Sequence, residues 1–210
     1  MKPAIIAISG FSSDSGKTSL LCSLLSAFPE WEAIKITRGH FRSCGKDPHT
    51  CCVSHLLSDE PVIRSGREQT YTPGKDTGRY WDAGASNVHW VIVTDQQVEQ
   101  GIKQALQRVR APGVFIEGTS LLKYIDVDFA LMAARPEGGK IKPSARRALP
   151  RSSAIYLFDD DSTDSPQALE RFSAWAKTTK DADLLNRLPL YTSKNLPDLI
   201  AELRALPMPA

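Results

Sequence analysis

No stretch of the sequence approaches the roughly 20 consecutive apolar residues that a membrane-spanning helix requires. The 26 basic and 24 acidic residues leave a net charge of only +2, which gives no indication of a nucleic-acid or membrane-surface partner. The apolar run near the N-terminus is too short for a secretory signal, so we expect a cytosolic protein. Four cysteines in such a protein are expected to be thiols or metal ligands rather than disulfides.

Internal repeats and low-complexity tracts are also absent, and short β-branched runs instead alternate with helical patterns. This alternation predicts an α/β fold with a doubly wound, mostly parallel sheet in a single domain over residues 1–210. The expected strands are 4–9, 33–37, 88–93, 114–116, 127–132, 154–158 and 190–192. The expected helices are 19–25, 53–57, 76–85, 96–110, 166–177 and 197–206.

The first predicted strand is followed by a glycine- and serine-rich segment that ends in Gly16-Lys17-Thr18. A strand, such a loop and a helix form the context of a P-loop, in which main-chain amides surround a polyphosphate. Lysine reaches the β- and γ-phosphates in such loops, and the threonine hydroxyl binds Mg²⁺. We therefore expect ATP or GTP, with Mg²⁺, to contact Gly10, Ser13, Asp14, Ser15, Gly16, Lys17, Thr18 and Ser19.

Five residues separate Gly10 from Gly16, one more than in the usual P-loop pattern. This longer loop resembles dethiobiotin synthetase and the related amide-forming cobyrinate enzymes. The dimerising ATPases related to that group carry an extra lysine early in the loop, where this chain has Ser12. Because relatives of the group often build the site at a two-fold interface, the resemblance admits a homodimer.

Two further charged residues are candidates for the nucleotide site. Glu117 ends a predicted strand, where P-loop proteins place an acidic residue that holds Mg²⁺ through water; it could also be a strand-end cap. Lys35, within the second strand, could point at phosphate or substrate, or it could equally be an edge-strand lysine. We assign Lys17, Lys35 and Glu117 as the candidate catalytic residues.

The segment from Pro73 to Ala85 contains Pro-Gly-Lys-Asp-Thr-Gly-Arg-Tyr and then Ala-Gly-Ala. It resembles a segment of the GTP-binding adapter of molybdopterin-guanine dinucleotide biosynthesis, the B protein of that pathway. The Ile34-Lys35 and Ile116-Glu117-Gly118 sequences match the same family, and the resemblance covers about the first 120 residues. It implies a nucleotide, Mg²⁺, and positions for Asp76 and Arg79 near the nucleotide or substrate.

Residues 38–74 form a long Cys- and His-rich insertion after the second strand. Thiolate and imidazole are preferred ligands of Zn²⁺ and other transition metals. The spacing matches no standard zinc finger, so the alternative is a set of buried thiols and ordinary loop histidines. The candidate ligands are Cys44, His49, Cys51, Cys52 and His55, next to His40.

Residues 135–151 form a basic segment between two late predicted strands. It could act as a lid over the phosphates or bind an anionic second substrate, with Arg146 and Arg147 as contacts, or it could be a solvated surface loop.

Three functions follow from these patterns. The first is an NTPase or phosphotransferase that passes the γ-phosphate to water or a small acceptor in cofactor metabolism. The second is a GTP-binding adapter in molybdenum cofactor guanylylation with a protein partner. The third is a metal-handling maturation GTPase that uses the cysteines and histidines. The Asn-Lys-x-Asp guanine motif is absent, which leaves ATP and GTP both open.

Overall fold

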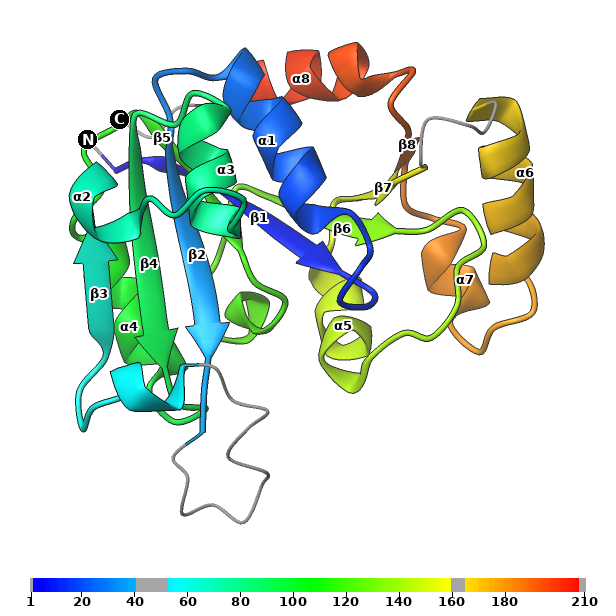
Figure 1. The fold of residues 1–210 in the computed structure, drawn as a ribbon. Coiled ribbons are helices and arrows are strands. Elements are labelled where there is room, and N and C mark those ends of the chain that lie inside the picture. Colours follow the sequence, from blue (N-terminus) through cyan, green and yellow to red (C-terminus); the bar gives the residue numbers. More distant parts are fainter. Residues whose placement is uncertain (1, 41–52, 160–164, 208–210) are drawn as a thin grey trace.

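The computed structural model describes residues 2–40, 53–159 and 165–207, whose strands form one eight-stranded sheet (Figure 1). The strand order is β3-β4-β2-β5-β1-β6-β7-β8. Only β3 runs antiparallel to its neighbour among the paired strands of these residues. The strands are β1 (Ala4–Gly10), β2 (Glu32–Arg38), β3 (Val62–Ser65), β4 (Asn87–Val93), β5 (Gly113–Glu117), β6 (Phe129–Ala134), β7 (Ala154–Leu157) and β8 (Leu190–Tyr191). The predicted α/β fold with a mostly parallel sheet is confirmed.

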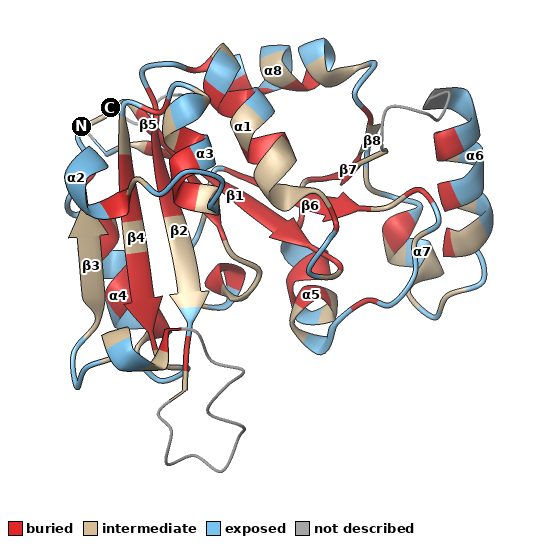
Figure 2. Ribbon diagram, in the orientation of Figure 1, coloured by how far each residue is buried: buried red, intermediate tan, exposed pale blue. Residues whose placement is uncertain are grey.

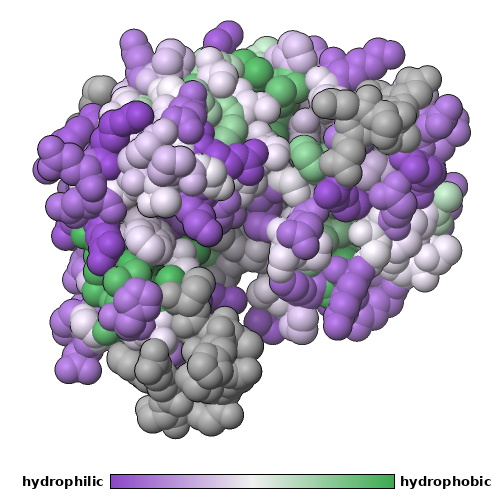
Figure 3. Space-filling view, in the orientation of Figure 1, coloured by the Kyte–Doolittle hydropathy of each residue, from purple (hydrophilic) through white to green (hydrophobic). Residues whose placement is uncertain are grey.

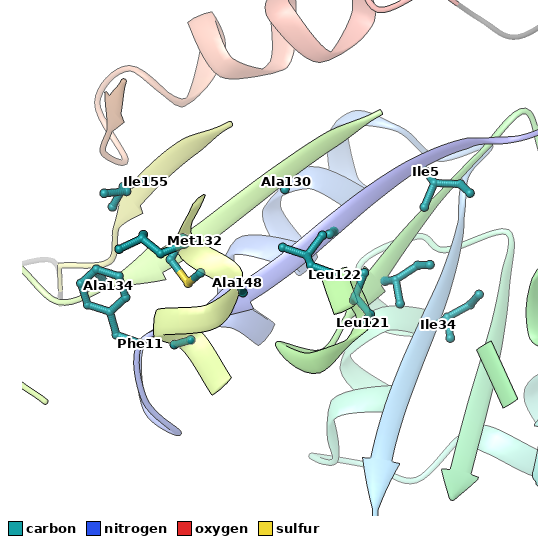
Figure 4. Close-up of a cluster of buried hydrophobic side chains, with 14 of the residues drawn as sticks. Ile5, Phe11, Ile34, Leu121, Leu122, Ala130, Met132, Ala134, Ala148 and Ile155 are labelled. Atoms are coloured by element: carbon teal, nitrogen blue, oxygen red, sulfur yellow. The ribbon is translucent and has the colours of Figure 1, made fainter. Parts of the chain in front are cut away.

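Helices cover both faces of the sheet, so the central strands are buried on both sides (Figure 2). On β1, Ile5 and Ala7 face one core and Ile6 and Ile8 face the other, as the two-residue repeat of a strand requires. One face carries α1 (Lys17–Ala27), α3 (Asp76–Asp82) and α8 (Leu196–Arg204). The other carries α4 (Val98–Leu106), η3 (Ser120–Lys123), α5 (Pro143–Ala148), α6 (Ser165–Ala176) and α7 (Ala182–Leu185), and Figure 4 shows part of its core.

The chain changes direction across the sheet at β1. After β1 it passes through α1 to β2 on one side, whereas β6, which follows β5, pairs with β1 on its other side. The carboxyl ends of these parallel strands lie at one edge of the sheet (Figure 1). Ligands of open α/β sheets bind at this edge, next to such a reversal.

Two segments contain regular structure that the sequence analysis did not predict. Residues 53–74 hold β3 and α2 (Arg67–Thr70) in addition to η2 (Ser54–Leu56), which lies where a helix was predicted over 53–57, and the basic segment 135–151 holds α5 and η4 (Leu149–Arg151). Strand β3 has only four residues, too few to show an alternation of apolar and polar side chains. Its antiparallel pairing with β4 depends on tertiary structure, so the sequence pattern did not reveal it. The start of α5 could have been recognised from Pro143, because proline is favoured in the first turn of a helix.

Other differences concern helix ends. The helix predicted over 96–110 is α4, which ends at Leu106, and the helix predicted over 76–85 ends at Asp82. In the latter, Gly84 adopts a φ of 97°, a left-handed conformation that stops a helix and turns the chain towards β4.

A buried charged residue begins β2. Glu32 accepts hydrogen bonds from His89 Nε2 at 2.7 Å and from the amides of Arg110 and Ala111 at 2.8 and 3.0 Å. Ser65 Oγ lies 2.8 Å from the other ring nitrogen of His89. Burial alone would raise the pKa of Glu32, but these hydrogen bonds outweigh it and hold the pKa below its ordinary value. The network thus ties β2, β3 and β4 to the residues before β5.

We expect this network to stabilise the fold in a pH-dependent way. A carboxyl with a depressed pKa in the folded state contributes stability above its unfolded pKa, near 4.5, and loses it as the pH falls further. Glu32→Gln should lower the free energy of unfolding by about 2 kcal/mol at pH 7, and by progressively less below pH 4.5. Urea unfolding at several pH values measures this loss of stability.

Glu99→Gln, in an exposed pair with Lys103, is the matched control and should change stability by less than about 0.5 kcal/mol. A Glu32→Gln effect of equal size at pH 7 and pH 3 would contradict the assignment.

The face of the molecule seen in Figure 3 is mostly hydrophilic, with apolar side chains in smaller groups. Within residues 2–40, 53–159 and 165–207, every helix is too short or too polar to traverse a bilayer.

Candidate functional site

The loop between β1 and α1 has the geometry needed to surround an anion. Gly16 caps α1 with a φ of 83°, and a Cβ at this position would also collide with the ring of Phe158. A Cβ on Gly10 would lie 2.2 Å from Ser15 Oγ, so both glycines are required by close contacts. The first amides of α1 have no intrahelical partners and carry the positive end of the helix dipole. The strand, loop and helix thus form the P-loop arrangement that the sequence predicted.

Basic side chains gather on this loop. Lys17 Nζ donates to the carbonyl oxygens of Ser12 and Ser13, each at 2.8 Å. Burial lowers the pKa of Lys17, and the neighbouring cations Lys35 and Lys142 lower it further, while Glu117 opposes them. Lys17 thus lies in the field of two other cations, so a bound anion would be attracted to this loop.

Lys142 and a further cation, Arg135, reach the loop from the segment that follows β6, the strand next to β1. Lys142 Nζ lies 2.6 Å from Ser13 Oγ, and Arg135 Nε donates to the carbonyl oxygen of Asp14 at 2.9 Å. The Arg135 guanidinium also lies 4.8 Å from the ring centre of Phe158. The sequence analysis placed Arg135 and Lys142 in the basic segment but did not select them as site residues.

An acidic cluster faces the start of α1. Thr18 Oγ1 lies 2.9 Å from Glu117 Oε2 and 3.2 Å from Asp76 Oδ1. Lys35 Nζ bridges the same two carboxylates, at 2.5 Å from Glu117 Oε1 and 2.5 Å from Asp76 Oδ2. The structure therefore brings together four residues from α1, β2, α3 and β5.

The strand register explains how Lys35 meets Glu117. The two residues are direct partners across the parallel pair β2 and β5, and both point to the face covered by α1 and α3. Because β2 lies between β4 and β5, the reading of Lys35 as an edge-strand lysine is wrong. Burial would lower the pKa of Lys35, but Glu117 and Asp76 outweigh it and raise the pKa. Lys35 is therefore a fixed cation between two carboxylates.

Tyr80 is a member of this cluster that the sequence analysis missed. Its hydroxyl donates a short hydrogen bond to Glu117 Oε2, and its side chain is fully buried. Burial, followed by the charge of Glu117, raises the pKa of Tyr80 well above its ordinary value, so the hydroxyl keeps its proton. The sequence could have indicated Tyr80, because it lies four residues after Asp76 on one helix and therefore on the same face.

A cavity of about 580 Å³ opens over the loop and the acidic cluster. Eleven of the predicted site residues line this cavity. Ser15, which was also predicted to contact the nucleotide, is fully buried and does not line it. Arg79 reaches over the first turn of α1 and donates to Ser19 Oγ at 3.2 Å. The lining residues named by the sequence analysis are Gly10, Ser13, Asp14, Gly16, Lys17, Thr18, Ser19, Lys35, Asp76, Arg79 and Glu117.

Two residues predicted as substrate or phosphate contacts lie elsewhere. Arg146 Nε pairs with Asp181 Oδ2 at 2.8 Å and so connects α5 to α7. Neither Arg146 nor Arg147 lines the cavity over the loop. From α5 the contribution to this cavity comes instead from Ser144, with Lys142 just before the helix.

The donor atoms around Thr18 suit Mg²⁺. This ion prefers oxygen ligands and is held in nucleotide sites by one or two carboxylates, a hydroxyl and the phosphates themselves. Thr18, Asp76 and Glu117 supply such a set, and Lys35 shows that the carboxylates attract a cation.

The predicted transition-metal ligands Cys44, His49, Cys51 and Cys52 lie outside the described residues. Of that group only His55 is described, in η2. Within the described ranges, no set of three or more His, Cys, Asp or Glu side chains is placed to hold a metal ion. Cys22 is half-buried in α1, and burial raises the pKa of its thiol to about 11, as fits a packing role.

Comparisons with known proteins complete the description. No protein-family model matches the sequence, and no curated protein matches it. Among solved structures, similarity extends over 91% of this chain to "apo" form LpxK from Aquifex aeolicus in complex with ATP, at 18% sequence identity and a TM-score of 0.48. The match covers 54% of the LpxK chain, so the present chain spans about half of that protein's length.

Proposed function

We propose that this chain is one nucleotide-binding domain that holds a nucleoside triphosphate and Mg²⁺ at the Gly10–Thr18 loop and cleaves the γ-phosphate. The observation that carries the proposal is the convergence, in one cavity, of a helix N-terminus, three lysines and an oxygen-rich cluster. Phosphoryl transfer needs mainly this combination of positioning and charge, with little covalent participation by the protein.

The residues divide into three tasks. The loop amides and Lys17 bind the phosphate oxygens, and Thr18, Asp76 and Glu117 provide oxygen ligands for Mg²⁺. Lys35 sets the charge of those carboxylates, and Tyr80 fixes the orientation of Glu117. Mg²⁺, when bound, would neutralise charge on the β- and γ-phosphates.

The reaction is a displacement at the γ-phosphorus. An oxygen of water or of a small acceptor forms a bond to phosphorus, and the bond to the bridging oxygen breaks with its electron pair left on the nucleoside diphosphate. With water, the products are the diphosphate, inorganic phosphate and a proton. Lys142 and Arg135, which already contact the loop, are placed to balance charge on the transferring group.

A GTP-binding adapter in molybdenum cofactor guanylylation is the second candidate. The observation in its favour is that Asp76 and Arg79, from the segment resembling that family, both line the cavity. An adapter would bind GTP with a protein partner and turn it over very slowly.

Calorimetric titration of the wild-type protein with Mg²⁺·ATP and Mg²⁺·GTP tests the proposal. Binding of at least one of them with release of phosphate over many turnovers is the expected result. Tight binding of GTP alone with negligible turnover would favour the adapter, and failure to bind either triphosphate would refute both.

A further inference from the structure

A second cavity adjoins the one over the P-loop. It has a volume of about 680 Å³ and shares four lining residues with the first cavity: Arg38, Thr119, Ser120 and Ser144. Thr119 and Ser120 follow Glu117-Gly118 directly, and Thr119 Oγ1 accepts a 3.4 Å hydrogen bond from the amide of Gly10. The segment between the two cavities is therefore fixed to the start of the phosphate loop.

The lining of the second cavity is strongly basic. It holds four cationic side chains, from Arg38, Lys123, Arg147 and Arg151, against one carboxylate, Asp95. These charges come from β2, η3, α5 and η4, so residues far apart in the sequence converge on this cavity.

Two of the four cations already have strong partners. Arg38 pairs with Asp95 at 3.1 Å. Arg151 donates to the carbonyl oxygens of Leu122 and Ile125 and pairs with Asp126 at 2.5 Å. Arg151 thus acts mainly to connect η4 with the end of η3.

The other two cations are left uncompensated. Within the described part of the chain, neither Lys123 nor Arg147 has a carboxylate within ion-pair distance. Lys123 Nζ lies 5.0 Å from the ring centre of Tyr124, and both Lys123 and Arg147 are exposed to the cavity side of η3 and α5. A pair of unmatched cations in one concave site favours an anion, and a guanidinium matches a carboxylate or a phosphate in two-point contact.

We infer that this second cavity binds the anionic group of the acceptor, a carboxylate or a phosphate on a small molecule. Lys123 and Arg147 contact that group, and the hydroxyls of Ser120 and Ser144 lie where the two cavities join. The inference rests on the proposed function, which supplies the phosphoryl donor in the adjoining cavity. It gives Arg147 the second of the two roles that the sequence analysis left open, binding of an anionic second substrate rather than contact with the phosphates over the loop.

The test uses the full chain saturated with Mg²⁺ and a non-hydrolysable triphosphate analogue, so that the phosphate loop is filled. Inorganic phosphate and succinate are then titrated separately, and binding is followed by backbone amide shifts in ¹⁵N-labelled protein. At least one probe should bind and shift the amides of η3 and α5. Phosphate binding indicates a phosphorylated acceptor, and succinate binding indicates a carboxylated one.

Arg147→Glu and Lys123→Glu should each weaken binding of that probe by at least about tenfold, since each inverts one charge of the pair. Affinity for the nucleotide analogue should change less than about twofold, because neither residue lines the first cavity. Arg187→Glu is the matched control, an exposed arginine that lines neither cavity, and should leave both affinities unchanged.

The outcomes separate this inference from the proposed function. If the analogue binds but neither probe does, or if probe binding is the same in Arg147→Glu, Lys123→Glu and wild type, the acceptor site is refuted while nucleotide binding stands. If the wild-type protein binds no triphosphate analogue, the proposed function fails and the acceptor role fails with it.

Discussion

Lys17→Ala is expected to weaken binding of Mg²⁺·ATP or Mg²⁺·GTP by at least about 100-fold, the equivalent of about 2.7 kcal/mol. The lysine is the cation of the loop itself, and it lines the cavity from a partly buried site where screening by water is reduced. Isothermal titration calorimetry measures the change directly.

The stability of Lys17→Ala should stay close to that of wild type, because among the described residues the ammonium group hydrogen-bonds to the carbonyl oxygens of Ser12 and Ser13 and forms no ion pair. Lys103→Ala, on the far side of the sheet in an exposed pair with Glu99, is the control and should bind nucleotide normally. Wild-type affinity in Lys17→Ala for both triphosphates would show that the loop is not a phosphate site.

Lys35→Met is expected to lower the free energy of unfolding of the nucleotide-free protein by about 2–4 kcal/mol. It leaves two carboxylates facing each other across Thr18 with no cation between them, and Glu117 is almost fully buried. Urea unfolding in a chelating buffer measures the loss. Addition of Mg²⁺ should stabilise this variant more than wild type, since a divalent cation can replace the missing charge.

A second substitution checks the origin of that effect. Combining Lys35→Met with Asp76→Asn removes one of the two negative charges that repel each other. The double variant should therefore recover part of the stability that Lys35→Met loses. If the double variant is no more stable than Lys35→Met, the loss comes from packing around β2 rather than from the charges.

The sequence was most informative about sites whose residues lie close together in the chain. The P-loop could be recognised because its residues are consecutive and its strand and helix adjoin it. Glu117 could be selected because it ends an apolar strand, and Asp76 and Arg79 because they belong to a segment that resembles a nucleotide-binding family. The structure places all of them around one cavity.

Contacts that depend on strand order and register could not be predicted. Lys35 and Glu117 are 82 residues apart, and only the pairing of β2 with β5 makes them neighbours. Arg146 and Arg147 are adjacent in sequence, but successive helical residues point about 100° apart. One therefore pairs with Asp181 while the other faces the second cavity. A single basic segment thus separates into two roles that composition alone does not reveal.

Strand β2 carries a buried charged residue at its start, Glu32, and a half-buried one three positions later, Lys35. An odd separation puts their side chains on opposite faces of the sheet, about 10 Å apart along the strand. Glu32 joins the network that ties neighbouring strands together, while Lys35 lines the cavity over the Gly10–Thr18 loop. Substitutions that strengthen the Glu32 network should therefore raise the free energy of unfolding without changing the affinity for ligand. The Glu32 end of β2 is for this reason a suitable place to engineer thermal tolerance.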